Sequence, residues 1–285
     1  MNYHLKLQYN SKKGIKRIVS LDTEWSKNWR AVEKFVPFSM SIHSIFYDDE
    51  IVGNEINIEN LYMESELYFR SNDDTSDSFI KKIDLILQNY IDDNTTFVGH
   101  QISSDLHTLK QCSKNKLDTV EYLINTFKTR KITKEDLFNK DKFSVADTRY
   151  DIPSRIKGDE KLRNVSLRLN IFAVQNELNE MSLTKMYNTY LIDNDTTKSE
   201  KLLVLNWRHA FQTSLVWLVN GVYTHKPVFN SRYNKRLLLT NDIIYKMGNE
   251  QIPYLRTNEY VSSMKYDEIK KYVIKYNPKN NIFFE

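Results

Sequence analysis

The sequence predicts an α/β domain built around a mixed β-sheet. Segments rich in β-branched and aromatic residues come first, strand-like and helix-like segments alternate in the middle, and helical patterns follow from residue 162 onward. Elements in this order pack as helices against the faces of a sheet. No internal repeat is visible, and 285 residues suit one large domain or one domain with an appendage.

The composition excludes several other classes of protein. Hydrophobic residues make up 40% of the chain and aromatic residues 13%, which can support a core and argues against disorder. Cys112 is the only cysteine, which excludes a disulfide scaffold. Because no apolar run reaches about 18 residues and the N-terminus lacks a signal core, we expect no membrane partner. The expected location is intracellular and cytoplasmic, and a nuclear or viral-factory setting stays open. The six glycines form neither a Rossmann nor a P-loop motif.

Five segments have the character of strands. Residues 15–21 are rich in β-branched side chains, residues 35–46 alternate in part, and residues 50–58 follow an acidic turn. Residues 95–98 and 143–146 are short apolar segments. Together they predict a mixed five-stranded sheet.

The helical patterns account for most of the remaining chain. Residues 77–91 carry an apolar stripe at helical spacing, and a second helix begins near residue 105. Further helical patterns cover residues 162–169, 181–191 and 199–222. These helices are expected to flank the sheet.

The first candidate site lies where the first strand ends. Asp22 and Glu24 form a D-x-E pair in the sequence IVSLDTEW. Side chains alternate along a strand, so both carboxylates face the same side. Two hard oxygen ligands directed at one point suit a divalent cation. A solvated strand end would explain the pair equally well.

A second acidic residue strengthens the metal-site interpretation. Asp105 follows the short apolar strand at residues 95–98, in the sequence TFVGHQISSDLHTL, at the start of a predicted helix. The alternative role for Asp105 is that of a helix N-cap.

The order of these segments resembles the DEDD 3′–5′ exonuclease superfamily of the ribonuclease-H-like fold. Its first motif, an apolar strand followed by D-x-E, matches residues 18–24, and Glu24-Trp25 resembles the ribonuclease D and Werner-type branch. Its second motif matches Val98-Gly99 followed by residues 105–109. The resemblance covers about residues 15–222 and implies a ribonuclease-H-like mixed five-stranded sheet flanked by helices.

The third motif of this family is degenerate here. The family carries Tyr-x-x-x-Asp or His-x-x-x-x-Asp on a late helix, where this chain has His209 in the sequence NWRHAFQTS. Thr213 stands at the position of the last Asp in the Tyr-type register, and Ser214 stands there in the His-type register. Neither residue is a carboxylate, and hydroxyls are poor ligands for Mg²⁺.

The resemblance implies a two-metal-ion mechanism with Mg²⁺ or Mn²⁺. Asp22 would bridge both ions, Glu24 would hold the ion that activates water, and Asp105 would support the other. One of the two ions is expected to bind weakly because the fourth carboxylate is missing. His209 is a candidate general base with an ordinary pKa near 6.5, or else a structural histidine.

Other residues near these motifs have weaker functional interpretations. Asp147 ends a later strand, and the resemblance implies a structural role for it. His100 and His107 flank Asp105 and are interpreted as structural or substrate-adjacent. Cys112 is interpreted as a small packed residue, and Trp25 either belongs to the core or packs against a base or sugar.

The basic charge is concentrated at the C-terminal end. Residues 226–285 contain 11 Lys and Arg against 6 Asp and Glu, whereas residues 1–225 contain 30 and 31. We therefore predict a domain over residues 1–225 and a basic, Tyr-rich extension over residues 226–285. The extension could bind DNA or RNA through phosphate contacts and stacking, contact a protein partner or a second copy of the chain, or be an ordinary appendage.

Two functions follow from these observations. The first is a metal-dependent 3′–5′ exonuclease that acts on DNA or RNA ends and is weakened by the loss of the fourth carboxylate. The second is a catalytically inactive protein that keeps the exonuclease fold as a nucleic-acid-binding or complex-scaffolding module.

Overall fold

The computed structural model describes residues 1–8, 13–27, 35–47, 61–138, 140–153, 155–179, 181–219 and 238–276. The strands are β1 (Asn2–Gln8), β2 (Lys16–Lys27), β3 (Phe35–Tyr47), β4 (Tyr62–Phe69), β5 (Thr95–Gly99), β6 (Val145–Asp147), β7 (Ile171–Phe172) and β8 (Leu238–Leu239). The α-helices are α1 (Ser76–Gln88), α2 (Ile102–Cys112), α3 (Asp118–Thr129), α4 (Leu162–Arg168), α5 (Leu183–Asp193), α6 (Thr196–Val219), α7 (Thr240–Gly248), α8 (Asn258–Ser263) and α9 (Tyr266–Tyr276). Short 3₁₀ helices are η3 (Asp136–Phe138), η4 (Lys140–Lys142) and η5 (Pro253–Arg256).

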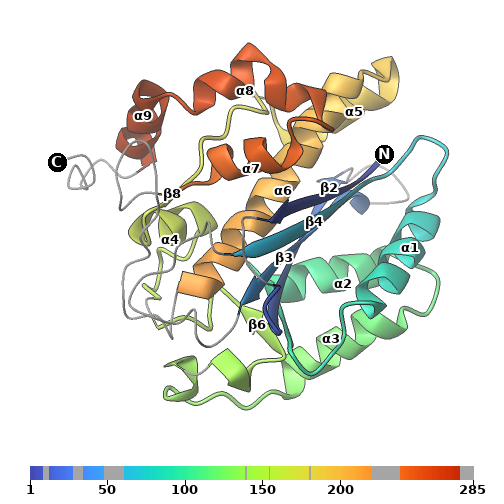
Figure 1. Cartoon of the computed structure of the whole chain (residues 1–285). Helices are drawn as coiled ribbons and strands as arrows, with labels where there is room; N and C mark the ends of the chain where they lie inside the picture. The colour runs from blue at the N-terminus through green and yellow to red at the C-terminus, as the bar shows by residue number, and fades with distance from the viewer. Residues whose placement is uncertain are drawn as a thin grey trace.

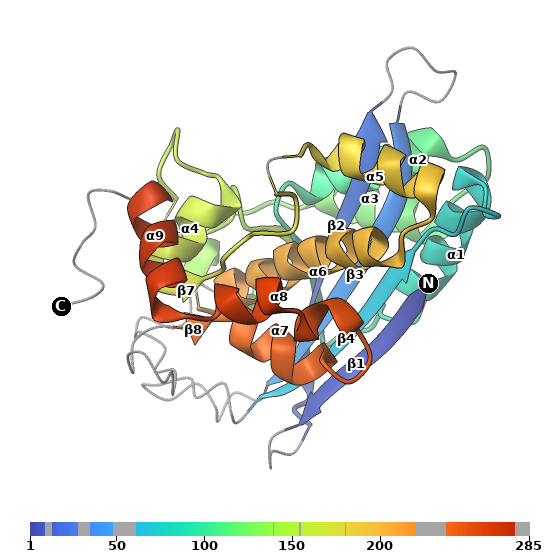
Figure 2. The same ribbon diagram turned by 90° about the horizontal axis from the view of Figure 1, so that it is seen from above.

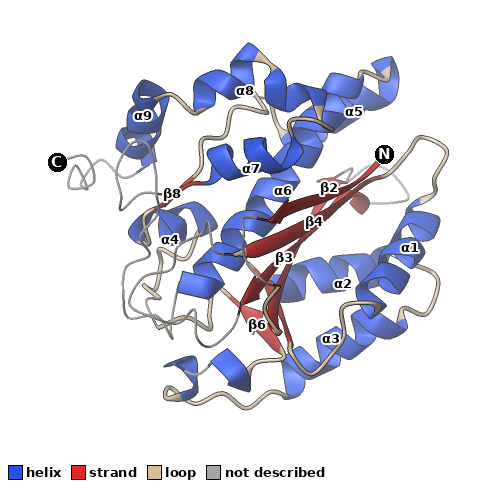
Figure 3. Cartoon of the chain, viewed as in Figure 1, coloured by secondary structure: helices blue, strands red, loops and turns tan. Residues whose placement is uncertain are grey.

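Within the described residues, the central sheet has six strands in the order β1-β4-β3-β2-β5-β6. The pairs β1/β4, β4/β3 and β3/β2 are antiparallel, and the pairs β2/β5 and β5/β6 are parallel. The prediction of an α/β fold with a mixed sheet and flanking helices is therefore confirmed (Figure 3).

The predicted number of five strands is wrong. The strands β1 and β4 were not predicted, and both interleave apolar residues with charged or polar side chains, as in YMESELYF. Such strands have one face in the core and one at its margin, so their average apolar content stays low. The predicted strand over residues 50–58 lies outside the described residues.

Helices cover both faces of the sheet. The α1, α2 and α3 helices lie on one face, and the long α6 helix crosses the other (Figures 1 and 2). Side chains of β2 alternate between these layers, with Ile18 in the core on the α6 side and Val19 and Leu21 in the core beneath α1–α3. This alternation fixes which face each later residue of β2 occupies.

The described part of the C-terminal extension packs on α6. Its apolar side chains, including Ile244, Leu255 and Val273, join the same hydrophobic core as Ile18. Tyr254 and Tyr260 are each 1% exposed, so their rings fill this core and are not available to stack on bases. The predicted boundary between residues 225 and 226 lies outside the described residues.

No helix in the described ranges is both long enough and apolar enough to cross a membrane.

Candidate metal and catalytic site

The candidate site lies at the carboxyl end of β2, on the face covered by α6. Because Ile18 and Ser20 face α6, the period of two along the strand also turns Asp22 and Glu24 toward this helix. Ser20 fixes the contact between the two elements, since its Oγ donates a hydrogen bond to the Ala210 carbonyl at 2.6 Å. A β-bulge between Glu24 and Trp25 then changes the register of β2 against β3.

His209 projects from α6 between the two carboxylates. Its Nδ1 lies 3.1 Å from Glu24 Oε1 and 3.5 Å from Asp22 Oδ2. One ligand atom from each of the three residues lies within 4.8 Å of the other two. The side chains of Asp22, Glu24 and His209 are 16%, 17% and 25% exposed, so this cluster opens to solvent at one edge.

Asn206 is a site residue that sequence reasoning missed. Its Nδ2 donates a hydrogen bond to Asp22 Oδ2 at 2.6 Å, and its Oδ1 accepts one from Ser39 Oγ at 3.1 Å. Asn206 precedes His209 by three residues and therefore shares its helix face. That spacing was the available signal in the sequence. The neutral amide thus occupies the space beside Asp22 and fixes the carboxylate's orientation.

A segment between β7 and α5 holds the other side of the His209 ring. Gln175 Nε2 lies 3.1 Å from His209 Nε2. Two residues later, Glu177 forms a fully buried ion pair with Arg208, the neighbour of His209 on α6. The ion pair ties this segment to the helix, so Gln175 is held against the imidazole.

Asp105 lies beside this cluster rather than within it. It sits in the first turn of α2 and is 4% exposed, while Gln101 takes the N-cap position, so the N-cap interpretation of Asp105 is wrong. Burial, together with repulsion from Asp22 and Glu24, raises the pKa of Asp105 well above its usual range. The carboxyl is therefore near both acids, although its oxygens lie outside the three-residue group.

Gly99 allows the tight turn that brings Asp105 into place. A Cβ atom at this position would lie 2.6 Å from Ile102 Cβ and 2.9 Å from Ile102 Cα. Only glycine fits where the end of β5 runs so close to the first turn of α2.

The charges in the cluster differ from the expectation for His209. Burial opposes its protonation, but the hydrogen bonds and charges of Asp22 and Glu24 outweigh this and raise the pKa of His209 to about 10. Burial, with repulsion from Asp22, raises the pKa of Glu24 despite the hydrogen bond from His209. The value near 6.5 is that of an unperturbed histidine, and the two carboxylates raise the pKa of His209 above it. The imidazole is a cation at neutral pH and cannot accept a proton while both carboxylates hold it.

The two residues considered for the fourth ligand lie deeper in the protein. Thr213 is 1% exposed, and its Oγ1 has no hydrogen-bond partner among the described residues. Ser214 Oγ donates to the Phe211 carbonyl on its own helix at 2.8 Å. Neither residue belongs to the three-residue group of possible ligands.

The neighbouring polar residues have local structural contacts. Asp147 Oδ1 accepts hydrogen bonds from the backbone N–H groups of Gln101 and Arg149, which agrees with the structural role implied for it. His100 Nδ1 lies 3.0 Å from Thr148 Oγ1. Two further contacts on α2 are those of His107 Nδ1 with the Ser103 carbonyl at 2.6 Å and of Cys112 Sγ with the Phe35 carbonyl at 3.3 Å.

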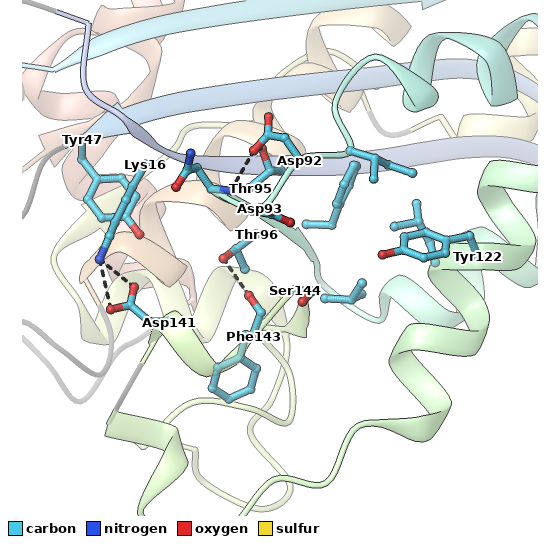
Figure 4. A pocket seen from close by; sticks show the side chains of 15 residues that line it. Lys16, Tyr47, Asp92, Asp93, Thr95, Thr96, Tyr122, Asp141, Phe143 and Ser144 are labelled. Carbon is cyan, nitrogen blue, oxygen red and sulfur yellow. Dashed lines mark hydrogen bonds and ion pairs between the residues drawn. The ribbon is translucent and has the colours of Figure 1, made fainter.

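A separate pocket of about 580 Å³ lies at the opposite ends of the parallel strands (Figure 4). Lys16 and Asp141 form an ion pair across it at 2.9 Å, and Thr96 Oγ1 donates to the Phe143 carbonyl at 2.8 Å. Asp92 and Asp93 also line the pocket, but among the described residues no three possible metal ligands come together there.

Comparisons with protein-family models, curated proteins and solved structures find no match to this chain.

Proposed function

We propose that this protein is a metal-dependent 3′–5′ exonuclease that acts on DNA or RNA ends. The observation that carries the proposal is the cluster of Asp22, Glu24 and His209, with ligand atoms within 4.8 Å of one another, beside the buried Asp105. These residues come from β2, α6 and the first turn of α2. The fold supports the proposal only at the level of an α/β protein with a mixed six-stranded sheet and flanking helices.

The residues present fit one divalent ion. Asp22 and Glu24 would supply oxygen ligands and His209 a nitrogen ligand, which favours Mn²⁺ over Mg²⁺ because Mg²⁺ prefers oxygen. Such an ion lowers the pKa of water and stabilises charge on a phosphodiester. A second ion would have to use Asp105 together with Asp22.

The chain's own side chains would orient the reacting groups. Asn206 fixes the Asp22 carboxylate, and the Gln175 side chain lies beside Nε2 of His209. In the absence of a competing cation, the proton on His209 Nδ1 is shared with Glu24 Oε1. His209 becomes able to accept a proton from water only when its contacts with both carboxylates are broken.

A second function is favoured by the same contacts. His209 and Asn206 stand against Asp22, and no fourth carboxylate joins the group in the described part of the chain. Here the imidazolium takes the place of a metal ion and offsets the charge of the acids. The protein would then keep the fold to bind nucleic acid or to support a complex without cleaving strands.

The test is a nuclease assay on single strands that carry a label at the 5′ end, in Mn²⁺, Mg²⁺ or EDTA. Exonuclease action from the 3′ end predicts a ladder of progressively shorter labelled products with Mn²⁺, a weaker ladder with Mg²⁺ and none with EDTA. A 3′-phosphorothioate linkage should slow the reaction. Asp22→Asn should abolish the ladder, and Asp141→Asn, in the pocket at the other end of the sheet, is the matched control. Intact strands in all wild-type samples would favour the binding function.

A further inference from the structure

A second feature of the surface is an exposed tyrosine beside two arginines. Tyr150 lies in the segment between β6 and α4 and is 41% exposed. The guanidinium carbons of Arg149 and Arg155 lie 5.5 Å and 5.1 Å from the centre of its ring. We refer to Arg149, Tyr150 and Arg155 as the Tyr150 cluster. It presents positive charge and an aromatic ring on one surface.

The charge of this cluster is only partly neutralised by the protein. Arg155 lies 3.4 Å from Glu160. Arg149 forms no ion pair with a carboxylate in the part of the chain that the structure describes, although its side chain is only partly buried. An anionic ligand would supply the contacts that Arg149 lacks.

A pocket of about 600 Å³ lies beside the cluster, between α2, α3 and the segment after β6. Tyr150 and Phe127 contribute aromatic rings to its lining, and Ser103, His107 and Gln111 contribute polar groups. The buried Asp147 also belongs to the lining, and the Arg130 guanidinium already lies over the Phe127 ring at 3.5 Å. Tyr150 is therefore the ring on which a planar base could stack, with polar groups of the pocket as hydrogen-bond partners.

His100 and Ser104 are the residues that relate the cluster and its pocket to the candidate site. His100 contacts Thr148, next to Arg149, at 3.0 Å. Burial lowers the pKa of His100 to about 4, with the positive charge of Arg149 acting in the same direction and Asp22 acting against it. His100 thus lies within electrostatic reach of both the Tyr150 cluster and the acidic residues of the site. The pocket also includes Ser104, which directly precedes Asp105.

We propose that the Tyr150 cluster and its pocket bind the single-stranded nucleic acid that leads into the candidate site. Arg149 and Arg155 contact phosphates, and one unpaired base enters the pocket and stacks on Tyr150. Bases within a duplex have their faces covered, so this surface selects single strands. The inference rests on the proposed function for the position of the strand's end, but strand binding itself needs no metal.

The experiment measures binding of the full chain to fluorescent 12-nucleotide single strands, by anisotropy in EDTA, so that no strand is cut. DNA, RNA and duplex DNA of one sequence form three arms. Tyr150→Ala should weaken single-strand binding about 5- to 100-fold, as expected for loss of one stacked base, and Tyr150→Phe should restore most of it. Arg149→Gln and Arg155→Ala should each weaken binding and reduce the slope of log K against log salt by about 0.7.

Two exposed residues elsewhere provide matched controls. Tyr122 on α3 is 50% exposed, and Arg256 on η5 is exposed, so Tyr122→Ala and Arg256→Ala remove the same kinds of side chain from other surfaces. Melting temperatures of all variants establish that they are folded. The proposal is overturned if wild type does not bind single strands at low salt, if duplex binds more tightly, or if the Tyr150 and Arg149 variants bind as the controls do. The DNA and RNA arms identify which nucleic acid is preferred.

Failure of this inference and failure of the nuclease proposal are separable. A chain that binds single strands through Tyr150 but never shortens them supports the binding surface and contradicts the exonuclease. If the wild type shortens strands and the Tyr150→Ala variant binds them as tightly as the wild type does, the exonuclease is supported and the binding surface is contradicted.

Discussion

Asn206 offers the sharpest perturbation of the candidate site, because it stands beside Asp22 where an additional carboxylate could ligate an ion. Asn206→Asp exchanges the amide for a carboxylate of almost the same shape. Asn206→Ala is the matched control, since it removes the hydrogen bond to Asp22 without adding a ligand. The pair separates the loss of an orienting contact from the gain of a metal ligand.

The expected magnitudes follow from the contacts. Asn206 is fully buried and donates to a charged oxygen at 2.6 Å, so Asn206→Ala should cost about 1.5–3 kcal/mol of unfolding free energy. In a domain of this size that lowers Tm by about 3–12 °C. Asn206→Asp should be at least as destabilised in EDTA, because two carboxylates then face each other. If the added oxygen ligand tightens Mn²⁺ binding about tenfold, saturating Mn²⁺ raises the free energy of unfolding of Asn206→Asp by about 1.4 kcal/mol more than that of the wild type.

The assay is thermal unfolding of wild type and both variants across a Mn²⁺ titration. Asn206→Asp should gain more Tm from Mn²⁺ than wild type gains, whereas Asn206→Ala should gain no more than wild type. Equal gains for the Asp and Ala variants, with both proteins folded, would refute the assignment of this position to the metal site. As a further comparison, Thr213→Asp should destabilise the protein in both conditions, because it buries a carboxyl without a partner.

Three further predictions concern stability. Burial lowers the pKa of His43 from 6.5 to about 3, so only the unfolded chain gains a proton between these values. The stabilisation is complete above pH 6.5 and falls toward pH 3 by about 1.4 kcal/mol per pH unit, and denaturant unfolding of His43→Gln should lack this contribution to the slope. Glu177→Gln leaves the buried Arg208 charge unpaired and should cost about 3–5 kcal/mol by urea unfolding, whereas Glu160→Gln, in an exposed pair, should have almost no effect. Gly99→Ala forces a Cβ against Ile102 and should cost about 1–3 kcal/mol in the same assay, and a cost near zero would contradict the close approach of β5 and α2.

The strands with continuous apolar segments, such as β2 and β5, were predicted from the sequence. The strands β1 and β4, in which apolar and polar residues alternate, were not. Residues 15–21 fall almost entirely within β2 and residues 95–98 within β5, since both strands are buried between two layers. The β6 strand begins two residues later than predicted, at Val145. β4 was missed although it alternates: Met63, Leu67 and Phe69 lie on its buried face, and Glu64 and Glu66 lie on its half-exposed face. The pairing of β4 with β3 depends on contacts between residues far apart in the sequence, which a local sequence pattern cannot indicate.

The candidate site was predictable only where it depends on local spacing. The shared orientation of Asp22 and Glu24 follows from the period of a strand, and His209 was found through its position in a motif. Asn206 and Gln175 depend on the rotation of α6 about its axis. From residue 202 to residue 219 every side chain of α6 except His209 is buried, so hydrophobic periodicity cannot indicate which side faces the sheet. Contacts across 184 residues, such as Asn206 with Asp22, require the folded structure.

The most direct test of the central claim is the anomalous diffraction of crystals grown with Mn²⁺ and a single-stranded oligonucleotide that resists cleavage. The account predicts a Mn²⁺ peak among Asp22, Glu24 and His209, with the 3′ end of the strand beside it. It also predicts that Asp22→Asn removes the peak. Crystals in which His209 still bridges both carboxylates at saturating Mn²⁺, with no peak between them, would contradict the metal-dependent mechanism.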